Sequence, residues 1–71
     1  MQYTPNALSR EIRERRKSLA LTQADLADLA GCSPRFVRDL ETGKPGVRLD
    51  KVLAVLEALG LELQLTPRQV P

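Results

Sequence analysis

The sequence predicts an all-α domain of four helices, followed by a short C-terminal strand. Apolar residues recur at helical spacings of three and four, two capped helix starts flank Gly31, and residues 61–65 switch to strict alternation. The 71 residues fit one small domain. One core of this size supplies only about 3 to 5 kcal/mol of net stability, so a dimer is expected.

Composition excludes several classes of function. The formal net charge is only +2, so any binding of polyanions must come from local clusters of basic residues. One cysteine and no histidine leave no plausible zinc site and no disulfide within the chain, and there is no glycine-rich phosphate loop. We therefore expect neither an enzyme nor a cofactor. No apolar run approaches the ~18 residues of a membrane span, and no signal peptide is recognisable, which indicates a cytoplasmic protein.

The first helix is predicted to begin at Thr4-Pro5, a cap followed by proline, and to end near Leu19 or Ala20. Its apolar stripe consists of Leu8, Ile12 and Leu19. Basic residues crowd the same third of the chain, namely Arg10, Arg13, Arg15, Arg16 and Lys17. They form either a local basic footprint or an ordinary solvated helix face.

A helix, a turn and a second helix are predicted from Thr22 to Glu41. Thr22 and Asp25 have the spacing of a capping box, Gly31 allows a sharp exit, and Ser33-Pro34 repeats the capped start. The expected inner residues are Leu26, Leu29 and Ala30, then Val37 and Leu40. A connection of about three residues is typical of the DNA-binding helix-turn-helix. Cys32, in the turn, is interpreted as a small, semi-buried apolar residue.

The helix after the turn directs four side chains outward or sideways, those of Arg35, Phe36, Arg38 and Asp39. Gly43 ends it, and a loop from Thr42 to Val47 follows. A fourth helix is predicted from about Leu49 to Leu59, with Gly60 as its stop. Its apolar stripe is expected to contain Leu49, Val52, Leu53, Leu56 and Leu59.

Residues 61–65 alternate as a strand does, yet the chain offers this strand no partner. Two copies related by a two-fold axis could pair these strands antiparallel, which would bury Leu61, Leu63 and Leu65. Alternatively, the segment extends the fourth helix or packs as a coil. Residues 66–71 contain two prolines and are interpreted as a frayed tail.

The run LTQADLA at residues 21–27 and the run from Gly31 to Lys44, which contains LETGK, resemble the Cro/CI-type (XRE) helix-turn-helix family of phage and bacterial repressors. The resemblance covers roughly Leu8 to Leu59 and implies a lambda-repressor-like fold. The C-terminal run LEALGLELQL is similar to HipB-like antitoxins, whose dimers share a C-terminal strand. These likenesses imply a DNA-binding domain over residues 1–60, a dimerising strand over 61–66 and a flexible tail over 67–71.

The resemblance also implies roles for individual residues. The helix that begins at Ser33 or Pro34 would be the recognition helix in the major groove. Its base-reading positions are Ser33, Pro34, Arg35, Arg38 and Asp39, where many relatives carry amides. The implied phosphate contacts are Thr22, Gln23, Phe36, Lys44 and Arg48. Arg16 and Glu41 match a pair that joins the first and third helices in the family, and are interpreted as structural.

For three of these positions, Phe36, Asp39 and Arg48, the sequence allows two different roles. Phe36 could contact a thymine methyl group or flank the core, and Asp39 could accept from a cytosine amine or hold Arg35 in place. Arg48 stands where similar sequences often carry a capping hydroxyl. Either the cap moves to Asp50 or Arg48 contacts a phosphate.

The expected function is that of a dimeric repressor of a palindromic double-stranded operator, in the nucleoid of a bacterial cytoplasm. The likeness to HipB implies the antitoxin of a HipBA-like operon, which represses that operon and binds a HipA-like kinase toxin. The alternatives are a free-standing phage-type or bacterial regulator and a helical protein-interaction module. No membrane partner is expected.

Overall fold

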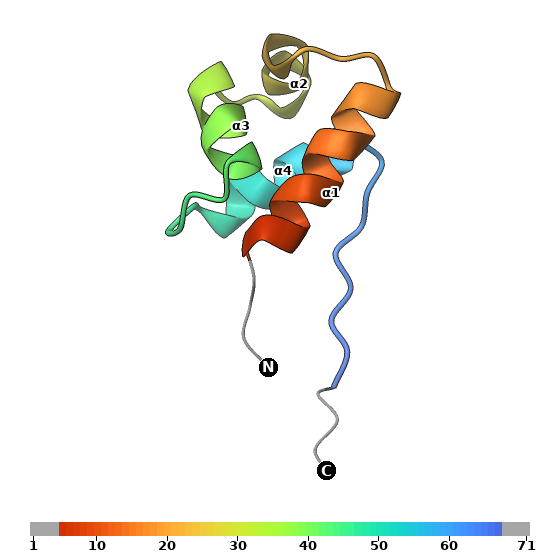
Figure 1. Ribbon diagram of the computed structural model, residues 1–71, viewed down its shortest axis with the longest axis vertical. Coiled ribbons are helices and arrows are strands. Elements are labelled where there is room, and N and C mark those ends of the chain that lie inside the picture. The colour runs from red at the N-terminus through yellow and green to blue at the C-terminus, as the bar shows by residue number, and fades with distance from the viewer. Residues whose placement is uncertain (1–4, 68–71) are drawn as a thin grey trace.

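The computed structural model describes the backbone of residues 5–67 and the side chains of residues 7–67. It contains four helices and, within these residues, no strand, so the all-α prediction is confirmed. The helices are α1 (Pro5–Ser18), α2 (Gln23–Ala30), α3 (Pro34–Glu41) and α4 (Leu49–Ala58). In Figure 1, α2 lies across one end of the molecule, with α1, α3 and α4 below it. α2 packs on α3 and α4, and α1 packs on α3.

α1 ends at Ser18, slightly earlier than predicted. The chain then turns at Ala20, whose φ of +57° lies in the left-handed region. Because Leu19 follows the last helical residue, its side chain does not continue the stripe of Leu8 and Ile12 and is exposed. The prediction that Leu19 is an inner residue is therefore wrong. The predicted cap at Thr4 lies outside the described residues.

The predicted capping of α2 and α3 is confirmed. The Thr22 hydroxyl oxygen accepts from the backbone N–H of Asp25 at 3.0 Å, and the Asp25 carboxylate accepts from the backbone N–H of Thr22 at 2.9 Å. The backbone N–H of Thr22, and then its side chain, stabilise the charged Asp25 carboxylate and hold the pKa of Asp25 below its ordinary value. Gly31 ends α2 with a φ of +71°, which costs glycine little. The Ser33 hydroxyl oxygen then accepts from the N–H of Phe36 at 3.1 Å and caps α3.

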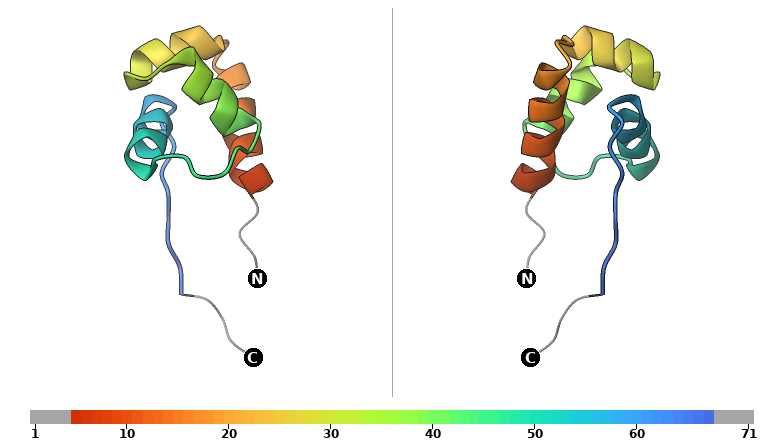
Figure 2. Two further views of the ribbon diagram at one scale, coloured as in Figure 1. Left: turned by 90° about the vertical axis from the view of Figure 1, so that its left-hand side faces the viewer. Right: turned by 90° about the vertical axis from the view of Figure 1, so that its right-hand side faces the viewer.

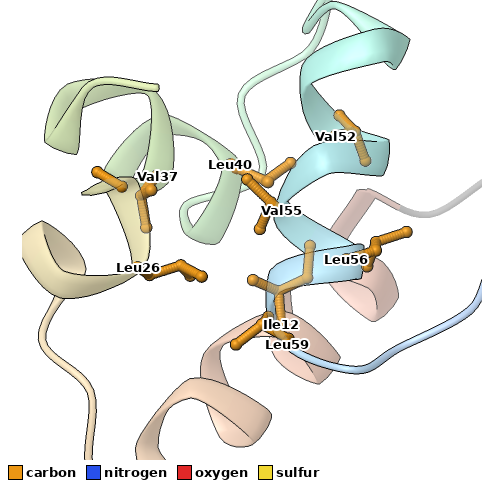
Figure 3. Packing of buried hydrophobic residues seen from close by; sticks show 9 residues of the cluster. Ile12, Leu26, Val37, Leu40, Val52, Val55, Leu56 and Leu59 are labelled. Atoms are coloured by element: carbon orange, nitrogen blue, oxygen red, sulfur yellow. The ribbon is translucent and has the colours of Figure 1, made fainter. Parts of the chain in front are cut away.

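The core lies between the four helices (Figure 3). Its buried members are Ile12, Leu26, Ala27, Val37, Leu40, Val52, Val55, Leu56 and Leu59. Leu29 is not among them, because its side chain is 63% exposed. At 100° per residue, Leu29 points about 160° away from Ala27, whose small side chain faces the core between Leu26 and the partly buried Ala30. The prediction of Leu29 as an inner residue is wrong.

The inner stripe of α4 also differs from the prediction. Val52, Leu56 and Leu59 are buried as expected, but Val55 completes the stripe, and Leu49 and Leu53 are exposed. Leu53 is turned about 100° from Val52, and Leu49 occupies the first position of the helix.

α4 ends at Ala58, so the alternative that residues 61–65 extend this helix is wrong. Gly60 has a φ of +69°, and the N–H of Leu61 closes the turn on the carbonyl oxygen of Leu56 at 2.8 Å. From there the C-terminal segment, residues 61–67, runs away from the helices (Figure 2). Leu61 packs against the core, whereas the side chains of Leu63 and Leu65 are 46% and 90% exposed. Pairing of this segment with a second copy stays a prediction.

Candidate nucleic-acid interface

The outer face of α3 carries two arginines, Arg35 and Arg38, whose side chains are exposed. Within residues 7–67, neither guanidinium group has a hydrogen-bond or ion-pair partner. Both line a shallow hollow of about 180 Å³, together with Pro34 and Gln23. Each guanidinium carries five N–H donors in a planar fork, a geometry that suits guanine edges and phosphates. The hollow therefore presents solvent-exposed N–H donors of α3 beside Gln23, the first residue of α2.

Gln23 is held in place by an internal hydrogen bond. It begins α2, and its Nε2 donates to Oε1 of Glu41 at 3.3 Å. The N-terminus of a helix exposes backbone N–H groups and favours anions. At this end of α2, the hydroxyl of Thr22 is engaged in the capping box. Gln23 is therefore the side chain of α2 best placed beside the hollow of α3.

Arg16 and Glu41 join α1 to the end of α3. Arg16 Nε donates to Glu41 Oε2 at 2.7 Å, and Nη2 donates to Oε1 at 3.0 Å. The Nη1 of Arg16 also donates to the carbonyl oxygen of Leu21 at 2.8 Å. This hydrogen bond holds the turn between α1 and α2 against α1. The two side chains are 11% and 3% exposed, and the hydrogen bonds to Glu41 raise the pKa of Arg16. This geometry suits the structural role that the sequence suggested.

Asp39 and Lys44 contact each other at the end of α3. The Nζ of Lys44 lies 3.5 Å from Oδ2 of Asp39, and the backbone N–H of Lys44 donates to the carbonyl oxygen of Asp39 at 3.0 Å. Asp39 therefore pairs with Lys44 and not with Arg35, so the alternative in which it holds Arg35 is wrong. Lys44 remains largely exposed, which leaves its ammonium group accessible to an anion.

Phe36 and Arg48 border a second hollow of about 180 Å³. Phe36 is partly buried against the core, and the ammonium of Lys51 lies 5.8 Å from the centroid of its ring. Arg48 occupies the N-cap position of α4, and Asp50 lies inside the helix, so the alternative cap at Asp50 is wrong. The side chain of Arg48 makes no capping hydrogen bond. Instead, Arg48 Nη2 donates to Asp50 Oδ2 at 2.8 Å, which lowers the pKa of this carboxyl.

Comparisons with known proteins decide the family. Residues 7–69, nearly the whole chain, match the helix-turn-helix domain family. The chain belongs to this family. It is 42% identical over 62 residues to an uncharacterised HTH-type transcriptional regulator, y4mF, of Sinorhizobium fredii, covering 87% of this chain and 82% of the relative. This helix-turn-helix chain is thus a DNA-binding transcriptional regulator of the XRE type, and its family and fold are not those of an enzyme.

Solved structures support the fold assignment of the regulator. A chain of the HipA-HipB-O2-O3 complex superposes with a TM-score of 0.83 at 22% identity, covering 97% of both chains. A chain of a complex between a HipB variant and an O2 20mer gives 0.83 at 23% identity, covering 97% of this chain and 96% of that one. The clp gene regulator ClgR of C. glutamicum gives 0.73 at 27% identity, covering 87% and 80%. The regulator therefore has the fold of HipB.

Two side chains of the regulator make contacts that the sequence analysis missed. Ser9 is buried, and its hydroxyl donates to the carbonyl oxygen of Leu40 at 2.6 Å. Arg15 Nε donates to the carbonyl oxygen of Leu59 at 2.9 Å, which ties α1 to the end of α4. Ser9 precedes Ile12 by one helical turn, which was a signal of its inward position. Nothing in the sequence links Arg15 to a carbonyl 44 positions away.

The described residues contain no group of three or more His, Cys, Asp or Glu side chains that could hold a metal ion. Among the helices of residues 5–67, none combines the length and the apolar character that crossing a membrane requires.

Proposed function

We propose that this regulator is a dimeric, sequence-specific repressor that places α3 in the major groove of double-stranded DNA. The observation that carries this proposal is the hollow shared by Gln23, Arg35 and Arg38. It puts a candidate phosphate anchor beside two unpaired candidate base readers. Phosphate contacts fix the register of a protein on the duplex, and base contacts then select the sequence.

The proposed base-reading surface is the exposed side of α3 and its cap, formed by Ser33, Pro34, Arg35, Arg38 and Asp39. Each arginine can donate two hydrogen bonds to O6 and N7 of guanine. Asp39 already faces the ammonium of Lys44, and one carboxylate oxygen can still accept from a cytosine amine. These chemistries favour a half-site that contains G·C pairs.

The proposed phosphate-contacting residues surround this surface, and comprise Thr22, Gln23, Phe36, Lys44 and Arg48. Gln23 and Lys44 offer N–H donors, and Arg48 offers an exposed guanidinium group at the start of α4, where it is also paired with Asp50. The backbone N–H groups of Thr22 and Phe36 are engaged in the caps of α2 and α3. These two residues would therefore contact the DNA backbone through their side chains.

Dimerisation would proceed through residues 61–66. The exposed Leu63 and Leu65 support this role, since alternate residues of a strand lie on the same face and such leucines gain from burial. Antiparallel pairing about a two-fold axis would present two copies of α3 to half-sites about 34 Å apart, or a multiple of it. A palindromic operator follows from this symmetry.

The experiment that tests the repressor proposal is selection of bound duplexes from a random pool at defined salt concentration. The expected result is an enriched inverted repeat whose half-sites are separated by about one helical turn or a multiple of it. A pool without any enriched sequence would overturn the proposal of sequence-specific binding. Binding of a protein ligand that is insensitive to salt, without DNA binding, would instead favour a helical interaction module.

A second, finer proposal is that the regulator is an antitoxin that represses its own operon and binds a HipA-like kinase toxin in the bacterial cytoplasm. The likeness to a chain of the HipA-HipB complex supports it, because it covers 97% of this chain, including the C-terminal segment. Co-purification of the regulator with the product of the neighbouring gene tests it. A kinase-like protein in the complex is the expected result, whereas no complex would favour a free-standing regulator.

A further inference from the structure

Three basic side chains of α1 lie on one face of the helix, outside the helix-turn-helix motif. Arg10, Arg13 and Lys17 follow one another at spacings of three and four residues, which keeps them within about 60° around the helix axis. All three are exposed, and no carboxylate of residues 7–67 pairs with them. This basic face of α1 is defined here as Arg10, Arg13 and Lys17.

Two hollows connect the basic face with the N-terminus of α2. The first, of about 480 Å³, is lined by the whole basic face together with Ser9, Glu14 and Glu41. The second, of about 410 Å³, brings Arg13 and Lys17 together with Gln23 and Thr42. Arg13 and Lys17 line both hollows, so the basic face continues directly from the proposed phosphate contact at Gln23.

The local charge favours an anion in these hollows. The carboxylate of Glu41 lies on their floor, but it is 3% exposed and is neutralised by the two hydrogen bonds from Arg16. Glu14 is an exposed carboxylate at the edge of the first hollow. Arg13 and Lys17 therefore direct uncompensated positive charge toward the side of the molecule on which Gln23 lies.

We infer that Arg13 and Lys17 contact a DNA phosphate adjacent to the one at Gln23, so that α1 extends the interface beyond the helix-turn-helix motif. This inference rests on the proposed DNA-binding function. An acidic protein partner would use the same charges, but the shared hollow with Gln23 favours the DNA backbone. Contacts of this kind add affinity without base preference, and each makes binding more dependent on salt.

The test compares the wild type with Arg13→Ala and Lys17→Ala on a mixed-sequence duplex, with salt varied from about 50 to 200 mM. Each variant should make the slope of log affinity against log salt shallower by about one unit for every phosphate that it no longer neutralises. The same change should occur on a selected operator, because a phosphate contact does not depend on sequence. Thermal unfolding of each variant verifies that the domain remains folded.

A matched pair of acidic variants controls for net charge. Glu14→Gln and Glu11→Gln each raise the net charge by one, but Glu14 borders the first hollow and Glu11 points about 160° away from Arg13. Glu14→Gln should strengthen binding by roughly two- to fivefold at low salt, which corresponds to a surface charge interaction. Glu11→Gln should leave the affinity close to that of the wild type.

The outcomes separate this inference from the function on which it rests. A wild-type protein that binds duplex DNA weakly and without salt dependence would overturn the proposed function. If the wild type shows a steep salt dependence that Arg13→Ala and Lys17→Ala leave unchanged, the inference is overturned and the proposed function stands. Equal strengthening by Glu14→Gln and Glu11→Gln would also overturn the inference, because net charge alone would explain the effect.

Discussion

The guanidinium of Arg16 grips both carboxylate oxygens of Glu41, through hydrogen bonds of 2.7 and 3.0 Å between α1 and the end of α3. A nearly buried carboxylate of this kind destabilises the folded protein if its charged partner is removed. The same carboxylate also accepts from Gln23, at the start of α2. One side chain of α3 therefore contacts both of the helices that precede it.

Removal of one partner of this pair should strongly destabilise the domain. Glu41→Ala leaves the Arg16 guanidinium without its counter-charge, and we expect a loss of about 3 kcal/mol in the free energy of unfolding. Urea denaturation followed by circular dichroism measures this loss. The double variant Arg16→Met with Glu41→Leu should recover most of the stability, because no charge is left unpaired. A double variant no more stable than Glu41→Ala would contradict this explanation.

The Asp25 cap should make stability depend on pH in the acid range. Because its hydrogen bonds to Thr22 hold the folded pKa of Asp25 below the unfolded value, its stabilising effect is complete above about pH 5 and is lost as the pH falls through the folded pKa. The variant Asp25→Asn keeps an acceptor but lacks the charge. Its melting temperature should lie below that of the wild type near neutral pH and approach it in acid. A difference that stays constant with pH would contradict this assignment.

Arg35 and Gln23 should respond differently to substitution in binding assays. Arg35→Ala should cost about 1 to 3 kcal/mol on the selected operator and relax the preference at one base pair. Gln23→Ala should weaken operator and random duplexes to a similar degree, because a phosphate contact carries no sequence information. Competition binding on single-base variants of the operator measures both effects. Equal losses on operator and random DNA for both variants would remove Arg35 from the base readers.

The two faces of the C-terminal segment provide a matched test of dimerisation. In a strand, Leu63 and Leu65 lie on one face, and Glu62 and Gln64 lie on the other. The double change Leu63→Lys with Leu65→Lys should therefore weaken the dimer, while Glu62→Lys with Gln64→Lys should alter it much less. Sedimentation equilibrium of both variants gives the dissociation constants. A dimer that survives the leucine changes would place the contact elsewhere.

The residues that begin and end helices were predictable because they act locally. The side chains of Thr22 and Ser33 accept hydrogen bonds from backbone N–H groups three positions further on, and Gly31 adopts the left-handed conformation that ends a helix. These three residue types therefore indicate where α2 begins and ends and where α3 begins. The helix after the turn, α3, and its exposed arginines were predictable for the same reason. A helix of eight residues with a cap at its start has few possible orientations once Val37 and Leu40 face inward.

The inner faces of α2 and α4 were less predictable, because the hydrophobicity of a residue does not determine which side of its helix packs against the neighbouring helices. Leu29 is a larger apolar residue than Ala27, yet Ala27 is fully buried in the helix that packs on α3 and α4, and Leu29 is 63% exposed. The contact of Arg15 with Leu59 depends on how α1 and α4 pack, which no local pattern encodes. Of the candidate site, the pairing of Asp39 with Lys44 was missed for a similar reason, since it depends on the path of the loop after α3.

The hydrogen bond from Gln23 to Glu41 has a consequence for the entropy that this protein would lose on binding DNA. An amide nitrogen carries two hydrogens, so one N–H of Gln23 stays available after the other donates to Glu41. This hydrogen bond restricts the side chain in the free protein, so Gln23 would lose less than the roughly 0.5 to 1.5 kcal/mol of rotamer freedom that an unrestrained side chain loses on binding. Arg35 and Arg38 have no such tether within the described residues. Gln23 would therefore contact a phosphate with its side chain already oriented, whereas the arginine side chains would become ordered on binding.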